Sequence, residues 1–437
     1  MPKNIVICCD GTGNEINSNL SNVLKLFRCL VKDADQRVFY HPGVGTIGLQ
    51  STWRRVKQET YGVFSLATGA GLDEDILAAY RFLCETYQSG DKVWLFGFSR
   101  GAYTVRVLAA FIHVIGLLPP DQIDLAGYAL SVYKNASAQG QESGANEKKF
   151  LDQAWQFRRV AGGYLIPIEC MGVWDTVNSV IVPRQDKFLP DLQTLAYTRT
   201  NQSVKKFRQA MAIDERRRMF RLNRWVEPQK FRSDQFDPST EVAQDIRQVW
   251  FAGVHGDVGG GYPEVESGLS KYPLLWMIAQ AKAAGLRVDD SIVNHLGWGF
   301  PRPPSKHVYV PPSPTAELHV SLTGLWWILE FLPKKEKYRE WLQRKCFLGW
   351  YIPDAEPRPI PGKPLTSTPE IPIIHRSVLE RMVQVPSYQP INFPADYTIE
   401  EGPSPPVAAA AAEPAPAGPP ADPPPVALPG PDPTLPG

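Results

Sequence analysis

The chain has 437 residues, of which 43% are hydrophobic and 11% aromatic, and its formal net charge is +1. A chain of this size can bury a large core, whereas a charge so close to zero provides no attraction to nucleic acid. The N-terminus passes from Met1 into an apolar strand without the charged lead and apolar core of a signal peptide. We therefore expect a cytoplasmic protein with no nucleic-acid partner; export that needs no signal peptide is compatible with this pattern.

The predicted elements alternate between strand and helix, which is the pattern of an α/β fold with a mostly parallel sheet and helices on both faces. Strands are expected at residues 3–9, 37–40, 93–98, 166–174 and 249–254, and helices at 22–31, 73–87, 105–117 and 274–284. The segments 118–165 and 178–245 are richer in charge, so we interpret them as lid-like insertions. The domain is expected to span residues 1–400, with a helical, cap-like part at 287–400.

The first strand runs into Asp10-Gly11-Thr12, for which two interpretations compete. In a hydrolase this loop donates the N–H of Gly11 or Thr12 to an oxyanion, and Asp10 orients the loop. In a phosphatase with an aspartyl nucleophile, an aspartate would stand two residues before Asp10. Cys8 occupies that position, so the sequence favours the hydrolase interpretation.

The strand at 93–98 ends in Gly97-Phe98-Ser99-Arg100-Gly101 and is followed directly by a predicted helix. In such an elbow the serine sits on a tight turn, and Gly97 and Gly101 relieve the crowding on either side of it. The hydroxyl then projects above the sheet, where it can act as a nucleophile. Ser99 is therefore the candidate nucleophile, and the N–H of Arg100 is a candidate oxyanion donor. Together these features predict an α/β-hydrolase-like domain.

A serine nucleophile needs a base and an orienting acid, which follow it in that fold in the order acid, then histidine. Asp175 comes directly after the strand at 166–174 and precedes the candidate histidine, so it is the favoured acid. Asp214 is a rival, although its charged neighbours are more typical of a solvated or ion-paired surface. Asp257 is a second rival, which could instead brace the loop around it or bind a cation.

The candidate base is His255, because it follows the strand at 249–254 and opens the glycine-rich run Gly256-Asp257-Val258-Gly259-Gly260-Gly261. A histidine at a strand end, in a loop freed by glycines, can place its ring over a neighbouring serine. His41 precedes the serine in the chain, and His113 lies inside the helix after the elbow. The other four histidines lack a preceding apolar strand with a glycine-rich exit: His295, His307, His319 and His375.

Two segments near the C-terminus have unusual composition. Residues 318–332 form an apolar run that contains Trp326 and Trp327 and is shorter than the roughly 20 residues that cross a bilayer. This run is either a helix buried against the body, or an interfacial helix that lines an acyl pocket and makes transient contact with a membrane surface. Residues 401–437 are rich in Pro and Ala and contain no Lys or Arg, which predicts a disordered tail.

The ordered set of motifs resembles a known family, the uncharacterised α/β-hydrolase domain family described as domain of unknown function 2235. That family includes the catalytic domains of type VI secretion phospholipase effectors. By this resemblance, Ser99, Asp175 and His255 fall on the family's catalytic triad. Lys271 stands where many relatives have an aspartate. The motifs that carry the resemblance lie at residues 9–14, 40–46, 97–103, 172–177, 213–217 and 249–262.

The sequence as a whole predicts a serine hydrolase that cleaves carboxylic esters, with a small-molecule or lipid ester as substrate and a phospholipase activity favoured by the resemblance. This chemistry requires no metal and no organic cofactor. An acyltransferase would use the same triad with an alcohol in place of water. A binding protein on the same fold, without turnover, is the alternative from another class. Nothing in the sequence indicates an oligomeric state.

Overall fold

The structure is a computed structural model, and it describes most of the chain. The described residues are 2–11, 19–43, 71–143, 147–177, 181–182, 191–192, 195–218, 220–331, 333–336, 339, 341, 345–352, 355–361 and 371–406. Residues Met1–Pro403 form one compact unit, and Ser404–Gly437 are assigned to a second. Most of the segment expected to be a tail, residues 407–437, lies outside the described residues.

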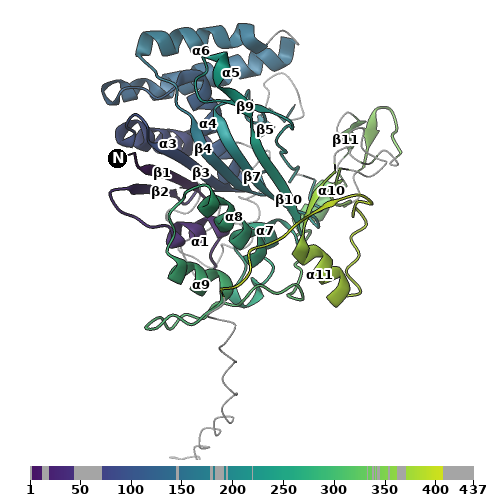
Figure 1. Ribbon diagram of the computed structural model, residues 1–437. Helices are drawn as coiled ribbons and strands as arrows, with labels where there is room; N and C mark the ends of the chain where they lie inside the picture. Colours follow the sequence, from purple (N-terminus) through teal and green to yellow (C-terminus); the bar gives the residue numbers. More distant parts are fainter. Residues whose placement is uncertain are drawn as a thin grey trace, which may run out of the picture. The chain divides into compact units, whose positions relative to one another are not determined.

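The core of the first unit is an eight-stranded sheet whose neighbouring strands are all parallel (Figure 1). The predicted α/β fold is therefore confirmed. The strand order is β14-β13-β10-β7-β4-β3-β1-β2. The strands are β1 (Asn4–Cys9), β2 (Gln36–His41), β3 (Lys92–Phe98), β4 (Ile168–Trp174), β7 (Val204–Ala212), β10 (Asp245–Phe251), β13 (Ile373–His375) and β14 (Thr398–Glu400).

Helices cover both faces of this sheet, because the side chains of each central strand alternate between two apolar layers. In β1, Ile5 and Ile7 belong to one layer and Val6 and Cys8 to the other. The first layer is completed by α3 (Leu72–Thr86), α4 (Arg100–Ile115), α5 (Ala126–Ser143) and α6 (Glu147–Ala161). The second is completed by α1 (Asn22–Cys29), α8 (Lys271–Ala283) and α9 (Asp290–Trp298).

The segments between the predicted elements contribute to the sheet as well as to its surroundings. Residues 178–245 contain β7, a strand that the sequence analysis did not place and that lies between β4 and β10. The cap-like part contains β13, β14 and α11 (Arg376–Gln384). Three small antiparallel pairs complete the strands: β5 (Ile181–Val182) with β6 (Asp191–Leu192), β8 (Lys230–Arg232) with β9 (Glu241–Ala243), and β11 (Lys334–Lys335) with β12 (Trp350–Tyr351).

The apolar run at 318–332 forms a much shorter helix than expected, α10 (Leu325–Glu330). Gly324 precedes it at a φ of +52°, and the residues before Gly324 are not helical. Trp326 is buried, whereas Trp327 is 43% exposed. Among the described residues, no helix combines the length and the apolarity that a membrane crossing requires.

Lys271 lies fully buried at the start of α8. Its Nζ forms an ion pair with Glu264 Oε1 at 2.5 Å, and Lys25 Nζ of α1 pairs with the other oxygen of Glu264 at 3.2 Å. Burial lowers the pKa of Lys271 to about 7. The shared carboxylate ties α1 to α8, so this lysine has a structural role.

Candidate active site

The turn between β3 and α4 has the geometry of a nucleophile elbow. Ser99 adopts a φ of +55°, which is strained for any residue other than glycine. A Cβ on Gly97 would overlap the backbone of Gly101, and a Cβ on Gly101 would overlap the carbonyl group of Cys9 in β1. Only glycine fits at both positions, which is the physical reason for the Gly-x-Ser-x-Gly spacing in this chain.

His255 and Asp175 form a buried hydrogen-bonded pair, although they are 80 residues apart in the chain. Asp175 follows β4 directly, and His255 opens the short helix α7 (His255–Gly259) after β10. His255 Nδ1 lies 2.5 Å from Asp175 Oδ2. An ionised carboxylate can only accept, so Nδ1 carries the proton in this pair. Nε2 of His255 has no hydrogen-bond partner among the described residues and is left to act as a base.

A third residue, Arg358, clamps the same carboxylate from the C-terminal part of the chain. Its Nη1 lies 2.5 Å from Asp175 Oδ1, and its Nη2 lies 3.0 Å from Oδ2. The backbone N–H of Ala212 also donates to Oδ1, at 3.0 Å. The carboxylate therefore has a partner on every side, and its orientation is fixed. No recognisable motif surrounds Arg358, so nothing in the sequence pointed to this residue.

The pKa values of both members of the pair lie below their ordinary values, but for different reasons. Burial by itself raises the pKa of Asp175, but the charge of Arg358 and the hydrogen bond from His255 outweigh it and hold the pKa well below its usual range. Burial lowers the pKa of His255, and Asp175 opposes this shift only in part. Asp175 is thus ionised and the imidazole neutral near pH 7, as a general base requires.

Ser99 lies next to this pair, with an aromatic residue bridging the two. The ring of Phe98, its neighbour in β3, packs against the His255 ring with centroids 4.7 Å apart. Phe220 covers the imidazole from another direction, at 4.9 Å and nearly perpendicular. Within the described part of the chain, no hydrogen bond joins Ser99 to His255. Such bonds often tighten only when substrate is bound.

The charge run after β7 is ion-paired, as one of the two interpretations of the sequence expected, but its acid Glu215 is buried and not on the surface. Glu215 is fully buried, and its carboxylate forms a bidentate ion pair with Arg217, both N–O distances being 2.9 Å. The same carboxylate accepts the backbone N–H of His255 at 3.2 Å and the hydroxyl of Ser321 at 3.0 Å. Arg217 holds the pKa of Glu215 at about 2 despite its burial. Glu215 is therefore a positioning residue for the histidine loop that sequence analysis missed.

The two rival acids also hold this loop, but neither contacts the His255 ring. Asp214 accepts the N–H of Gly253 at 2.7 Å. Asp257 accepts the N–H of Val254 at 3.0 Å, which agrees with the expectation that it braces the loop. Both carboxylates are thus used by the backbone on the strand side of His255.

Asp257 has a second partner, which creates another histidine–aspartate pair. His319 Nδ1 lies 2.6 Å from Asp257 Oδ1, and its Nε2 lies 3.2 Å from Glu266. The His319 ring stacks on Tyr262 with centroids 3.5 Å apart. Since both of its ring nitrogens are occupied, His319 has none left to act as a base. In the part of the chain that the structure describes, no group of three or more acidic, His or Cys side chains is arranged to hold a metal ion.

Another histidine that the sequence analysis set aside lies at a strand end. His375 ends β13, and its side chain accepts the backbone N–H of Ser377 at the start of α11. Its ring stacks on Phe251, and burial lowers its pKa to about 4. His375 therefore caps a helix and is not part of the site.

The loop after β1 is organised by Asp10, as the hydrolase interpretation expects. Asp10 is buried, and it accepts hydrogen bonds from the hydroxyls of Ser21 and Tyr40. It also accepts the N–H of Gly11 at 2.7 Å, so this donor is engaged within the loop in the structure. Thr12 lies outside the described residues, and its role as an oxyanion donor stays a prediction.

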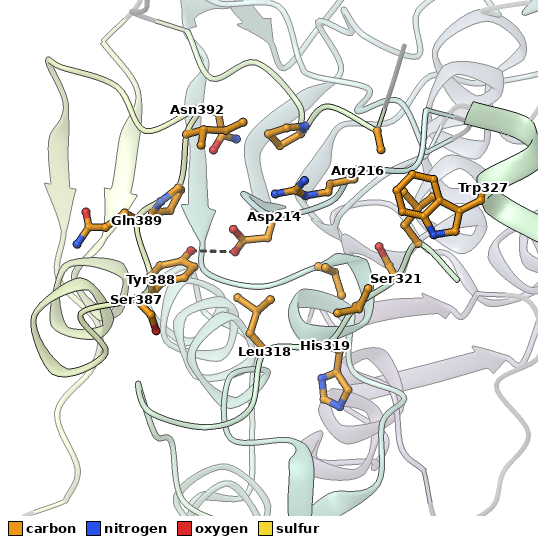
Figure 2. Close-up of a pocket in the computed structure, with 17 residues that line it drawn as sticks. Asp214, Arg216, Leu318, His319, Ser321, Trp327, Ser387, Tyr388, Gln389 and Asn392 are labelled. Atoms are coloured by element: carbon orange, nitrogen blue, oxygen red, sulfur yellow. Dashed lines mark hydrogen bonds between the residues drawn. The ribbon is translucent and has the colours of Figure 1, made fainter. Parts of the chain in front are cut away.

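A pocket of about 390 Å³ opens beside the histidine loop (Figure 2). Its wall is mostly apolar and includes Val254, the residue before His255. Trp327 lies at one side of the pocket, and Asp214 faces Tyr388 across a 2.8 Å hydrogen bond. Arg216 is exposed and also lines it. The size and lining are those of a site for a small, largely apolar ligand.

Comparison with known proteins connects this site to a described family. The model of the Tle1-like phospholipase effector of the type VI secretion system, catalytic domain, matches residues 3–280. This match confirms the resemblance that the sequence motifs indicated. The matched part contains Ser99, Asp175 and His255 but not Arg358.

Similarity to individual proteins is low and covers only part of each chain. The chain is 30% identical over 228 residues to the uncharacterized protein YEL023C of Saccharomyces cerevisiae, and this match covers 50% of the chain and 32% of the yeast protein. A crystal structure of an uncharacterized protein from Pseudomonas aeruginosa matches with a TM-score of 0.33 and 18% identity, covering 66% of this chain and 46% of that one. The Tle1 effector bound to the VgrG spike matches with a TM-score of 0.29 and 19% identity, covering 61% and 52%. The chain thus spans about a third to a half of the length of these proteins.

Proposed function

The chain belongs to the family of Tle1-like phospholipase effector catalytic domains, and from this we propose that it hydrolyses carboxylic esters with Ser99, Asp175 and His255 as its catalytic triad. The observation that carries the proposal is the buried His255–Asp175 hydrogen bond beside an elbow serine. The three residues come from the carboxyl ends of β3, β4 and β10, which meet at one edge of a parallel sheet.

In the first step, His255 Nε2 takes the proton of Ser99 Oγ, and the oxygen attacks the ester carbonyl. Asp175 holds the imidazole tautomer and stabilises the imidazolium that forms. The N–H of Arg100, with one from the loop after Asp10, stabilises the oxyanion, and one such donor is typically worth ~10²–10³ in turnover. His255 then gives its proton to the leaving alcohol, which departs from an acyl-enzyme.

In the second step, a water molecule replaces the alcohol. His255 removes a proton from the water, the resulting hydroxide attacks the acyl carbonyl, and the bond to Ser99 Oγ breaks. The carboxylic acid is released, and the serine recovers its proton. An acyl acceptor other than water would give an acyltransferase by the same route, so an added alcohol tests that alternative directly.

We further propose a lipid ester, most simply a glycerophospholipid, as the substrate class. Support comes from the apolar lining of the pocket beside Val254 and from Trp327, whose ring is 43% exposed at that pocket. An exposed tryptophan at an apolar opening suits transient contact with a membrane surface.

The nucleophile is tested with Ser99→Ala and a fluorophosphonate probe. The variant should lose labelling and the hydrolysis of short p-nitrophenyl esters, while Ser131→Ala, a change on the exposed face of α5, should keep both. Persistent labelling of the Ser99→Ala protein would refute the elbow assignment. Absence of labelling in the unmodified protein would favour a binding protein without turnover.

The substrate class is tested separately, by mass spectrometry of fatty acids released from mixed glycerophospholipid vesicles. The unmodified protein should release fatty acids and Ser99→Ala should not. Filling the pocket with Ser387→Trp should reduce release from vesicles while sparing acetate esters. Turnover confined to water-soluble esters would reject the lipid substrate and leave a general esterase.

A further inference from the structure

We infer that Arg358 is a positioning residue for the triad acid, so that the C-terminal segment around it completes an active site whose other members lie within residues 3–280. The inference rests on the proposed function, because it assigns a role relative to Asp175 and His255. Arg358 lies 78 residues beyond the end of the family match. The residue that binds the Asp175 carboxylate thus comes from a segment in which the sequence shows no motif.

The ion pair between Arg358 and Asp175 is bidentate and is shielded from solvent. The two terminal nitrogens of Arg358 each bind a different oxygen of Asp175, and the side chains of Arg358 and Asp175 are 6% and 0% exposed. A planar guanidinium paired in this way fixes the plane of the carboxylate as well as its charge. That plane decides whether Oδ2 points at His255 Nδ1, which it does at 2.5 Å.

Arg358 is in turn held from both sides. Its Nε donates to the carbonyl oxygen of Phe220 at 3.0 Å, and its Nη2 donates to the same oxygen at 2.5 Å. Its backbone N–H donates to the carbonyl oxygen of Glu215 at 3.3 Å, and its own carbonyl oxygen accepts from Asn392 Nδ2 at 2.8 Å. Arg358 therefore links Asp175 to two loops, the one that contains Glu215 and Phe220 and the one that contains Asn392.

Such a cation has a second effect, on the basicity of the histidine. The charged groups around the His255 pair are Asp175 after β4, Glu215 and Arg217 after β7, and Arg358 from the C-terminal segment. Arg358 neutralises part of the charge that Asp175 presents to the ring. Its removal should therefore favour the imidazolium and raise the pKa of His255.

The test compares Arg358→Met and Arg358→Lys with the unmodified full chain. We measure kcat and KM for a short p-nitrophenyl ester, and the rate of fluorophosphonate labelling, between pH 5 and 9. Arg358→Met should lower kcat about 10²-fold with little change in KM, because the acid loses its fixed geometry. The acidic limb of the kcat profile of Arg358→Met should move to higher pH by about 1 unit. Arg358→Lys keeps the positive charge but lacks the planar guanidinium. It should therefore return the acidic limb of the pH profile to its original position but restore only part of kcat.

Arg302→Met, on an exposed arginine that donates to Ser291, is the matched control and should change neither readout. If Arg358→Met folds and shows an unshifted limb with kcat within about 3-fold of the unmodified protein, the inference is overturned. If Arg358→Met does not fold, Arg358→Lys decides: a reduced kcat with an unshifted limb supports the inference, and an unchanged kcat overturns it.

A failure of the proposed function would look different, because no ester would be turned over by any variant. In that case an NMR titration of His255 in the Ser99→Ala background replaces the rate profile. A higher imidazole pKa when Arg358 is also changed to Met supports the clamp, and an unchanged pKa refutes it.

Discussion

Replacing Asp175 by Asn decides which of three carboxylates is the triad acid. Asn keeps the shape of the side chain, but its amide cannot both hold the Nδ1 proton and balance the charge of the imidazolium. In a serine protease triad this change costs about 10⁴ in turnover with the geometry intact. We expect a similar loss here, which corresponds to about 5.5 kcal/mol on the barrier.

The structure also predicts that Asp175→Asn lowers stability, which the order of the triad residues in the sequence gives no reason to expect. Asp175→Asn leaves Arg358 buried without its counter-charge, and breaking a buried pair in this way costs about 3–5 kcal/mol. The compact unit runs from Met1 to Pro403, so at about 2.1 cal/mol/K per residue its unfolding entropy is about 0.85 kcal/mol/K. The melting temperature should therefore fall by about 4–6 °C.

The assay is kcat/KM for a short p-nitrophenyl ester, measured well below the melting temperature of each variant. Asp257→Asn is the matched control, because Asp257 is equally buried and also pairs with a histidine, His319, at 2.6 Å. It should lower the melting temperature, since it weakens the cap on Val254, but reduce turnover by no more than about 10-fold.

The reverse pattern would refute this reasoning. If Asp257→Asn abolishes turnover in a folded protein while Asp175→Asn slows it only a few-fold, the acid is misassigned. The glycine-rich loop after His255 would then carry the chemistry that we place at the end of β4.

Three further predictions concern the elbow, the pH profile and Asp214, the first of the two rival acids. Gly101→Ala should destabilise the protein by about 1–3 kcal/mol or more, since the new Cβ meets Cys9 in β1; Gly127→Ala, with nothing near its Cβ, should be neutral or stabilising by about 0.5 kcal/mol in calorimetry. Because burial lowers the pKa of His255, the midpoint of the acidic limb of kcat/KM should lie below pH 6.5, and a midpoint above pH 7 would contradict this. Burial raises the pKa of Asp214 from 3.8 to about 6, so its ionisation costs stability as the pH rises through 6. At pH 7.5, Asp214→Asn should therefore melt at a higher temperature than the unmodified protein, and its free energy of unfolding should be larger by up to about 3 kcal/mol. The gain should disappear near pH 4; a gain equal at both pH values would exclude this cause.

Local patterns in the sequence predicted the central strands of the sheet, whose apolar residues are buried on both faces. The strands β1, β3 and β4 were expected because most of their residues are apolar, which is typical of a central parallel strand. Of β10, only the apolar end at residues 249–251 was expected, because Asp245, Arg247 and Gln248 make its first part polar. β7 was missed, since Lys205, Lys206, Arg208 and Gln209 interrupt its apolar pattern. The structure shows how they fit: Arg208 pairs with Asp245, and Gln209 accepts a hydrogen bond from Arg106.

The same reasoning explains which site residues were visible in the sequence. Ser99 and Asp175 stand directly after β3 and β4, and His255 lies four residues beyond the end of β10, so their position at the same edge of the sheet follows from topology. Arg358 and Glu215 have no such marker. Whether a charged side chain is solvated or buried depends on the partner that folding brings to it, and here those partners lie up to 183 residues away in the chain. A charge run is therefore a weak predictor of a surface position wherever folding buries counter-charges together, as it does for Arg358 and Asp175, which are 183 residues apart in the chain.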